Sequence, residues 1–282
     1  MLSYSALFHA SRRKQLLLLL CLLTFALLLL RGALWQPLPE ERGAPPLLPA
    51  AHDWQGVADG CEHVYLDFGS NVGIQVRKLF EPHLFPAAPI LPIYDEYLGN
   101  VSERRTTTCA FGFEINPAHS LRLKALERAY SFRGWRTKFF TETGIGISTK
   151  YLDFISDKAP QWNEWGAKLV AKGTGDTVVA VVDISEFLRE AIVPRKLVPG
   201  KLGRRPTVVA KIDIEGLERK VFPRLVSYGL LCVIDYLYVE WHSEDKAEYT
   251  AAAEKLKKSG CTTRMELLDD ELGVVSNFAL PL

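Results

Sequence analysis

The sequence predicts an α/β fold built on a seven-stranded, mostly parallel sheet with helices on both faces. Between residues 61 and 282, short apolar segments alternate with amphipathic ones, which is the pattern of successive strand-helix units. The chain has 282 residues, of which 48% are hydrophobic and 24% charged, so it can bury the core of one such domain and still carry further segments. The expected strands are 63–68, 109–115, 137–142, 208–214, 234–241, 262–268 and 273–280, and the expected helices are 73–81, 117–133, 216–228 and 244–259.

The first expected strand runs into the pattern Asp67-x-Gly69-x-Asn71-x-Gly73 and then into a helix. Gly69 can take a sharp turn off the strand, and Gly73 would let the helix approach a ligand closely, so the segment predicts a nucleotide-cofactor loop. The acid Asp67 suits a cationic or hydroxyl-rich ligand better than a diphosphate. An ordinary strand-to-helix turn, capped by Asp67 and Asn71, is the alternative.

The second expected strand ends in Glu114, just before a helix entered at Pro117. Two vicinal hydroxyls can donate to one carboxylate, which is how doubly wound folds hold a ribose next to the glycine loop. Glu114 is therefore expected to bind the ribose of an adenosine-type ligand.

A later strand carries Lys211, Asp213 and Glu215 at alternate positions, so these side chains face one side of it. Unpaired burial of three charges would cost several kcal/mol each, so they are expected to pair or to line a polar cleft. Asp213 and Glu215 could also be merely the acids that begin the next helix.

Four segments together resemble the FkbM-like S-adenosylmethionine-dependent methyltransferases. Residues 65–73 look like the first motif of that family, residues 113–117 like its acidic FEPNP motif, and residues 211–218 like its KIDIEGxE block. The segment 238–242 is similar to the acid and histidine that end the family's next strand, and the resemblance covers roughly residues 60–280.

Two positions depart from the family pattern. Ser70 stands where alanine is usual, and Ile115 stands where proline is usual. Neither change removes a functional group, although Ile115 could alter how Glu114 is presented.

The resemblance implies a Rossmann-like class I methyltransferase fold and S-adenosyl-L-methionine as the cofactor. The acceptor would be a small molecule or glycan methylated on a hydroxyl oxygen, and no residue is assigned to a metal. The residues expected to bind the cofactor are Asp67, Gly69, Ser70, Asn71, Gly73 and Glu114. Those expected to orient or deprotonate the acceptor are Asp213, Glu215 and His242.

The N-terminal region predicts a membrane anchor. Residues 16–30 are almost uninterruptedly apolar and follow the basic cluster 12–14, so we expect a cytoplasmic tail at 1–14, a signal-anchor transmembrane helix at 15–35 and a Pro-rich stem at 36–60. The domain at 61–282 would then be lumenal, in a single-pass type II protein of the endoplasmic reticulum or Golgi. A cleaved secretory peptide, giving a secreted protein, is one alternative, and a mitochondrial leader is another.

The glycosylation sequon at Asn100 fits a lumenal domain. On the strand order that the resemblance implies, Cys61 and Cys109 precede neighbouring strands, so they are expected either to form a disulfide or to remain free and buried. A net charge of +1 gives no reason to expect a nucleic-acid partner.

Two inserts, 81–108 and 144–176, are expected to serve binding, since long inserts at strand ends often do so. The second contains Tyr151, Trp162 and Trp165, which suit stacking on a sugar or packing on the domain itself. Its Gly144-Ile-Gly146 segment is expected to be a turn, and Asp183 a helix cap.

Two other function classes fit parts of the sequence. In a lumenal glycosyltransferase, Asp213-Ile-Glu215 would resemble the acid-x-acid pair that holds a metal on a nucleotide sugar. A non-catalytic protein that keeps the fold for interaction is the other class.

Overall fold

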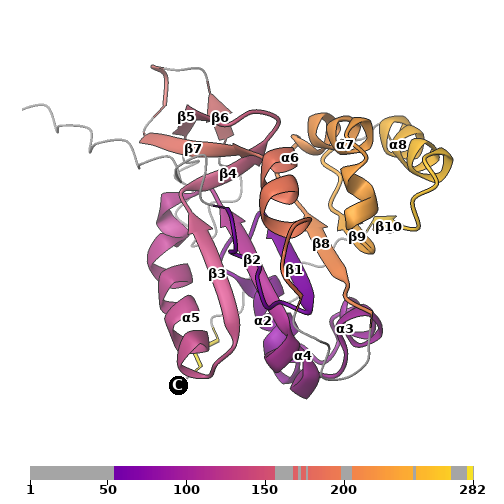
Figure 1. Ribbon diagram of the computed structural model, residues 1–282. Coiled ribbons are helices and arrows are strands. Elements are labelled where there is room, and N and C mark those ends of the chain that lie inside the picture. Colours follow the sequence, from indigo (N-terminus) through magenta and orange to yellow (C-terminus); the bar gives the residue numbers. More distant parts are fainter. Residues whose placement is uncertain are drawn as a thin grey trace, which may run out of the picture. The chain divides into compact units, whose positions relative to one another are not determined.

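A computed structural model describes residues 54–155, 168–170, 173–175, 177–197, 205–243, 246–267 and 278–281 (Figure 1). The expected cytoplasmic tail, the expected anchor at 15–35 and most of the expected stem lie outside these residues, as do Trp162 and Trp165. In the part of the chain that is described, no helix combines the length and apolarity needed to cross a bilayer.

The central sheet contains six strands in the order β10-β9-β8-β1-β2-β3, and every neighbouring pair runs parallel. Each strand corresponds to one that the sequence predicted. The expected seventh strand, 273–280, falls mostly outside the described residues. The strand bounds are β1 (His63–Phe68), β2 (Thr108–Glu114), β3 (Arg136–Thr141), β8 (Val208–Ile212), β9 (Tyr236–Val239) and β10 (Arg264–Leu267).

Helices cover both faces of this sheet, and the residues of β1 show why. Val64, Leu66 and Phe68 join a core cluster with residues of α6, α7 and α8, whereas Tyr65 joins a second cluster with residues of α2, α3 and α5. All six residues of β1 are buried, as expected for a central parallel strand. The helices are α2 (Ile74–Phe80), α3 (Leu91–Leu98), α4 (Val101–Thr107), α5 (Ser120–Phe132), α6 (Ile184–Phe187), α7 (Glu218–Ser227) and α8 (Ala247–Lys258). Short helical turns are η1 (Pro82–Leu84), η2 (Pro117–His119), η3 (Leu188–Ile192) and η4 (Leu230–Val233).

The insert after β3 builds a second sheet, of order β4-β7-β5-β6, from β4 (Thr143–Gly146), β5 (Lys150–Ile155), β6 (Lys168–Val170) and β7 (Thr177–Asp183). The expectation that residues 144–146 form a turn was wrong, because they are strand β4. A Cβ on Gly144 would lie 2.5 Å from Cδ1 of Ile115, so the glycine is needed for close packing. Ile145 and Val182 belong to the main core, which makes this insert part of the packed domain.

The insert 81–108 also contributes to the core, through buried residues of α3 and the segment before it. The sequon residue Asn100 lies at the start of α4. Its side chain accepts hydrogen bonds from the backbone amides of Ser102 and Glu103, and the Glu103 side chain accepts one from Asn100 N. Such a capping box fixes where the helix begins.

Trp54 is 4% exposed and packs edge-on against Phe140 and Phe187, so the packed body includes residues that the sequence assigned to the stem. Cys61 and Cys109 form a disulfide at the start of the neighbouring strands β1 and β2. Of the two alternatives left open for these cysteines, the bridge is the one found.

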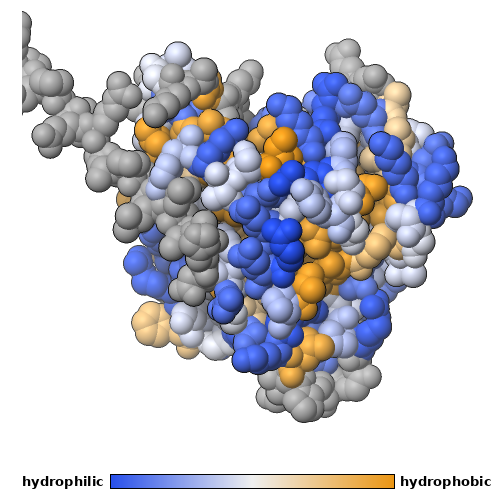
Figure 2. All heavy atoms as spheres, turned by 45° about the horizontal axis from the view of Figure 1, so that its top comes forward, coloured by the Kyte–Doolittle hydropathy of each residue, from blue (hydrophilic) through white to orange (hydrophobic). Residues whose placement is uncertain are grey.

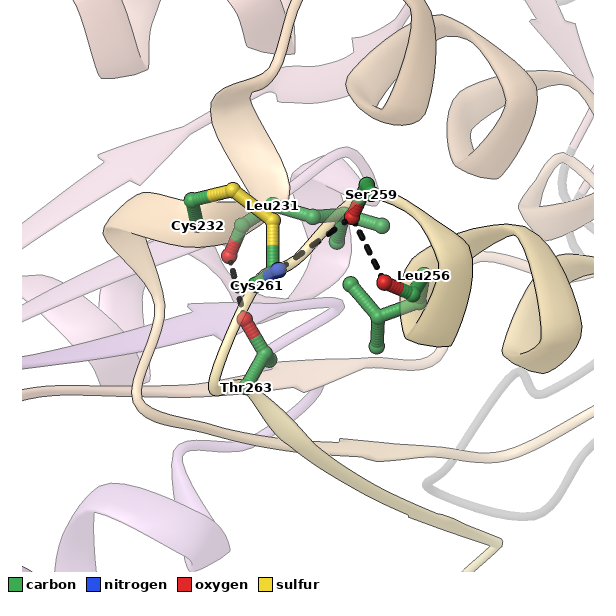
Figure 3. Close-up of a disulfide and its surroundings, with 6 residues drawn as sticks. All are labelled: Leu231, Cys232, Leu256, Ser259, Cys261 and Thr263. Carbon is green, nitrogen blue, oxygen red and sulfur yellow. Dashed lines mark hydrogen bonds between the residues drawn. A yellow bond between two sulfur atoms is a disulfide. The ribbon is translucent and has the colours of Figure 1, made fainter.

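A second disulfide, which the sequence did not pair, joins Cys232 to Cys261 at the edge of the sheet (Figure 3). Cys232 lies in η4 and Cys261 follows α8, so the bridge connects the segment entering β9 to the segment entering β10. The Thr263 hydroxyl reinforces this connection by donating to the Leu231 carbonyl at 2.8 Å.

Candidate functional site

The candidate site lies where the chain divides between the two halves of the sheet. From β1 the chain proceeds to β2 and β3 on one side, and β8, β9 and β10 lie on the other. In open α/β sheets, ligands bind at the carboxyl ends of the strands beside such a switch point. Figure 2 turns the upper side of Figure 1 toward the viewer and shows hydrophilic side chains gathered in the middle of that face, next to a hydrophobic strip.

Asp67, near the end of β1, is fully buried, and neither of its carboxylate oxygens has a hydrogen-bond partner. Burial raises the pKa of Asp67 to about 6, even though the positive charge of Lys211 acts in the opposite direction. The Ser70 hydroxyl donates to the Asp67 backbone carbonyl at 3.1 Å, and its position beside the carboxyl group also acts to lower the pKa of Asp67. A buried carboxylate without donors is costly, and a cationic or hydroxyl-bearing ligand would remove that cost.

The turn after Asp67 requires glycine at position 69. Gly69 has a φ of 89°, and a Cβ there would lie 1.8 Å from the backbone oxygen of Asp213. The amides of Gly69 and Ser70 both donate to the Phe113 carbonyl of β2, at 3.1 and 2.9 Å. The turn is thus held between the ends of β2 and β8, as the predicted sharp bend requires.

Gly73 is required for close helix packing, because a Cβ there would lie 2.9 Å from Leu126 and 3.1 Å from Leu123, both on α5. Its part in ligand access stays a prediction. Asn71, also in the left-handed region with a φ of 48°, has a buried side-chain oxygen without a partner. That oxygen is a second unsatisfied acceptor in the loop.

Glu114 holds two loops together. Its Oε2 accepts the Asn71 amide at 2.6 Å, and its Oε1 accepts the Asn116 amide at 2.7 Å. The side chain is buried, with the His119 imidazole 3.5 Å away, a neighbour that the sequence did not suggest. Two of the roughly four acceptor positions of a carboxylate are used by these amides, which leaves capacity for a ligand hydroxyl.

Lys211 connects the two sides of the switch point. Its Nζ donates to the Gly69 carbonyl at 3.0 Å and to Oδ2 of Asp213 at 2.7 Å. Burial acts to lower the pKa of Lys211, but the charges of Asp213 and Asp67 outweigh it and raise the pKa. The expected pairing of charges along β8 is therefore confirmed for Lys211 and Asp213.

His242, after β9, brings the three expected catalytic residues together. Its Nε2 lies 3.7 Å from Oδ1 of Asp213 and 3.7 Å from Oε2 of Glu215. A third carboxylate, Glu240, lies 3.5 Å from the same nitrogen. The possible ligand atoms of Asp213, Glu215 and His242 all lie within 4.8 Å of one another.

Glu218 fixes the orientation of His242. This carboxylate is fully buried, and its Oε1 receives the Ile214 amide at 2.8 Å and lies 3.1 Å from Nδ1 of the imidazole. The hydrogen bond to Glu218 raises the pKa of His242 to about 9 against the opposing effect of burial, and the nearby carboxylates add to the rise. The appeal of His242 as a base rested on a pKa near 6.5, and in this arrangement the imidazole is instead protonated at neutral pH.

The sequence did not assign Glu218 to the site, although it ends the KIDIEGxE block. Its position four residues after Ile214 was the available signal, because that spacing allows the side chain to reach back to a free amide at the start of a helix. By contrast, Asp183 is the helix cap that the sequence predicted, since its Oδ1 accepts the Ser185 amide at 2.8 Å. Asp183 is also paired with Arg224.

Comparison of the chain with protein-family models, with curated proteins and with solved structures gave no match.

Proposed function

We propose that the protein is an S-adenosylmethionine-dependent methyltransferase with a Rossmann-like class I fold. The observation that carries this proposal is the buried Asp67 carboxylate without donors, placed beside the Gly69 turn at the switch point of a parallel sheet. The methionine part of the cofactor carries an ammonium group, which such a carboxylate would bind as an ion pair and hydrogen-bond acceptor. The resemblance of the surrounding motifs to the FkbM-like family supports the same assignment.

The remaining expected contacts come from two loops, which would bind different parts of the cofactor. Glu114 would receive a ribose hydroxyl while it continues to hold the Asn71 amide. Gly69, Ser70 and Gly73 shape the turn from within, because their contacts are to Asp213, to the Asp67 carbonyl and to α5. They would therefore act on the cofactor through loop geometry.

The cofactor supplies an activated methyl group for in-line transfer. The protein must hold an acceptor hydroxyl about 3 Å from that methyl and accept its proton. During the transfer, the proton of the acceptor hydroxyl would pass to a carboxylate of the site. Asp213 and Glu215 are the carboxylates placed to orient the hydroxyl or take its proton, whereas a protonated His242 would stabilise the charge that develops on oxygen.

We further propose that the domain acts in the secretory pathway, anchored by the N-terminal segment, on a small-molecule or glycan acceptor. The two disulfides, Cys61–Cys109 and Cys232–Cys261, support an oxidising compartment.

Calorimetric titration of the full-length protein with S-adenosylhomocysteine, the demethylated product, tests the cofactor assignment. We expect Asp67→Asn to weaken binding at least about tenfold, because a charge-assisted hydrogen bond contributes roughly 1.5–3 kcal/mol. Glu96→Gln on α3 is the matched control, since it makes the same carboxylate-to-amide change on a half-exposed side chain. Equal affinity of the wild type and Asp67→Asn would refute the assignment.

A lumenal glycosyltransferase is the second candidate, and the cluster of Asp213, Glu215 and His242 favours it because nucleotide-sugar enzymes use such groups to hold a metal. A thermal-shift panel separates the two. Stabilisation by S-adenosylhomocysteine supports the methyltransferase, whereas stabilisation by a nucleoside diphosphate that depends on Mn²⁺ supports the glycosyltransferase.

A further inference from the structure

We propose that Asp213, Glu215 and His242, with Glu240 beside them, form a binding site for one divalent transition-metal cation of the Zn²⁺ or Mn²⁺ type. The site goes beyond the cofactor assignment, in which no residue was assigned to a metal. A role for the cation in lowering the pKa of an acceptor hydroxyl would rest on the proposed function, whereas cation binding itself does not.

The distances around Nε2 of His242 fit a shared ion better than direct contacts. The three carboxylate oxygens lie 3.5 to 3.7 Å from this nitrogen, whereas charge-assisted hydrogen bonds of this kind are about 2.7–2.9 Å long. Two ligands bonded at about 2.1 Å to one tetrahedral metal ion stand about 3.4 Å apart. The observed spacing is therefore close to that of atoms that coordinate the same ion.

The opposite side of the imidazole is held as in metal sites. Glu218, with its side chain 1% exposed, lies 3.1 Å from Nδ1 of His242 and is itself fixed by the Ile214 amide. When Nδ1 carries the proton given to Glu218, the lone pair of Nε2 points toward the three carboxylates. Carboxylate-histidine-metal arrangements fix the ligand tautomer in this way.

A second observation comes from Glu218, which lies behind the imidazole and is not one of the proposed ligands. The other carboxylate oxygen of Glu218, Oε2, is buried and has no hydrogen-bond partner. A buried carboxylate with one oxygen lacking a donor is costly. We infer that the region around His242 accommodates more positive charge than its own side chains provide.

The charges agree with this reading. Asp213, Glu215, Glu218 and Glu240 surround His242, and among the contacts described Lys211 is the cation that pairs with them. A divalent cation placed among these carboxylates would be attracted by each of them.

The ligand types determine the class of cation. Imidazole suits Zn²⁺ and other transition metals, while carboxylates suit Mn²⁺ and the harder ions, so a mixed set favours Zn²⁺ or Mn²⁺ over Ca²⁺.

The test is calorimetric titration of the full-length protein, first treated with a chelator, with ZnCl₂, MnCl₂ and CaCl₂. We expect one site for Zn²⁺ or Mn²⁺, with affinity at least tenfold higher than for Ca²⁺. Glu215→Gln and His242→Gln should each weaken it tenfold or more. Glu215 has a side chain that is 49% exposed, so this variant should fold even if loss of the His242 contact to buried Glu218 destabilises the other.

Glu248→Gln is the matched control, because this residue pairs with Arg219 on the protein surface. Absence of stoichiometric Zn²⁺ or Mn²⁺ binding, or unchanged affinity in Glu215→Gln, would overturn the proposal. Titration of the same proteins with S-adenosylhomocysteine keeps the two proposals apart. Cation binding without binding of that product would reject the methyltransferase assignment and leave the metal site standing.

Discussion

Replacing Asp67 by asparagine should stabilise the ligand-free protein while it weakens cofactor binding. Burial without donors raises the pKa of this carboxyl from 3.8 to about 6. Each pKa unit corresponds to about 1.36 kcal/mol, so the ionised carboxylate costs the folded state about 3 kcal/mol at neutral pH. Asp67→Asn removes that cost, because an amide is neutral at every pH in the range.

The stability that Asp67→Asn gains over the wild type must increase as the pH rises. Between pH 3.8 and about 6 the folded protein holds the Asp67 proton more firmly than the unfolded chain, so the stability contributed by this group falls as the pH rises through that window. Below it both states are protonated. The advantage of Asp67→Asn should therefore be near zero below pH 4 and reach about 3 kcal/mol above pH 6.

Urea unfolding of both proteins at pH 4 and pH 7.5, followed by circular dichroism, measures this difference. Asp183→Asn is the contrasting variant, because Asp183 is equally buried but caps α6 and pairs with Arg224. It should lose stability at pH 7.5. If Asp67→Asn is also less stable than the wild type at pH 7.5, the carboxylate has a partner in the folded protein and the reasoning fails.

Three further outcomes are expected. Gly69→Ala should cost about 3 kcal/mol or more, since its Cβ would meet backbone 1.8 Å away, whereas Gly134→Ala, also at positive φ but with open space around it, should cost about 1 kcal/mol; equal losses in urea unfolding would contradict this. Glu114→Gln can keep one of the two loop amide bonds, so we expect a loss of about 1–3 kcal/mol together with weaker product binding by calorimetry. Replacing Cys61 and Cys109 by alanine opens a link across 48 residues and should lower the free energy of unfolding by about 4 kcal/mol, and a loss below 1 kcal/mol would argue against the bridge.

The strands were predictable because the sequence of a central parallel strand is an unbroken run of apolar residues. His63–Phe68 was predicted with its exact bounds, and the five other strands of the main sheet were predicted to within three residues at each end. The second sheet as a whole was not predicted, because β5 lies in an insert without a clear apolar run and β4 contains two glycines that resemble a turn.

For the candidate site, the sequence predicted the residue types and their positions along the strands, but it did not predict the contacts between different helices and strands. The approach of Asp213 and Glu215 to His242 follows from the parallel strands β8 and β9 lying side by side, an adjacency that only the structure shows. The protonation of His242 depends on Glu218, a side chain from the next helix, and no spacing in the sequence reveals that contact. For the same reason, the packing role of Gly73 became visible only when Leu123 and Leu126 were in place.

The contact between Gly69 and the end of β8 would couple the binding of two ligands, one on each side of the switch point. Backbone meets backbone there without room for a methyl group, and one lysine, Lys211, donates both to the Gly69 carbonyl and to Asp213. A ligand that shifts the Gly69 turn must also move Asp213, and an ion that Asp213 coordinates must in turn change the position of the Gly69 turn. Occupancy on one side of the switch point should change affinity on the other by the same factor in both directions, as thermodynamic linkage requires.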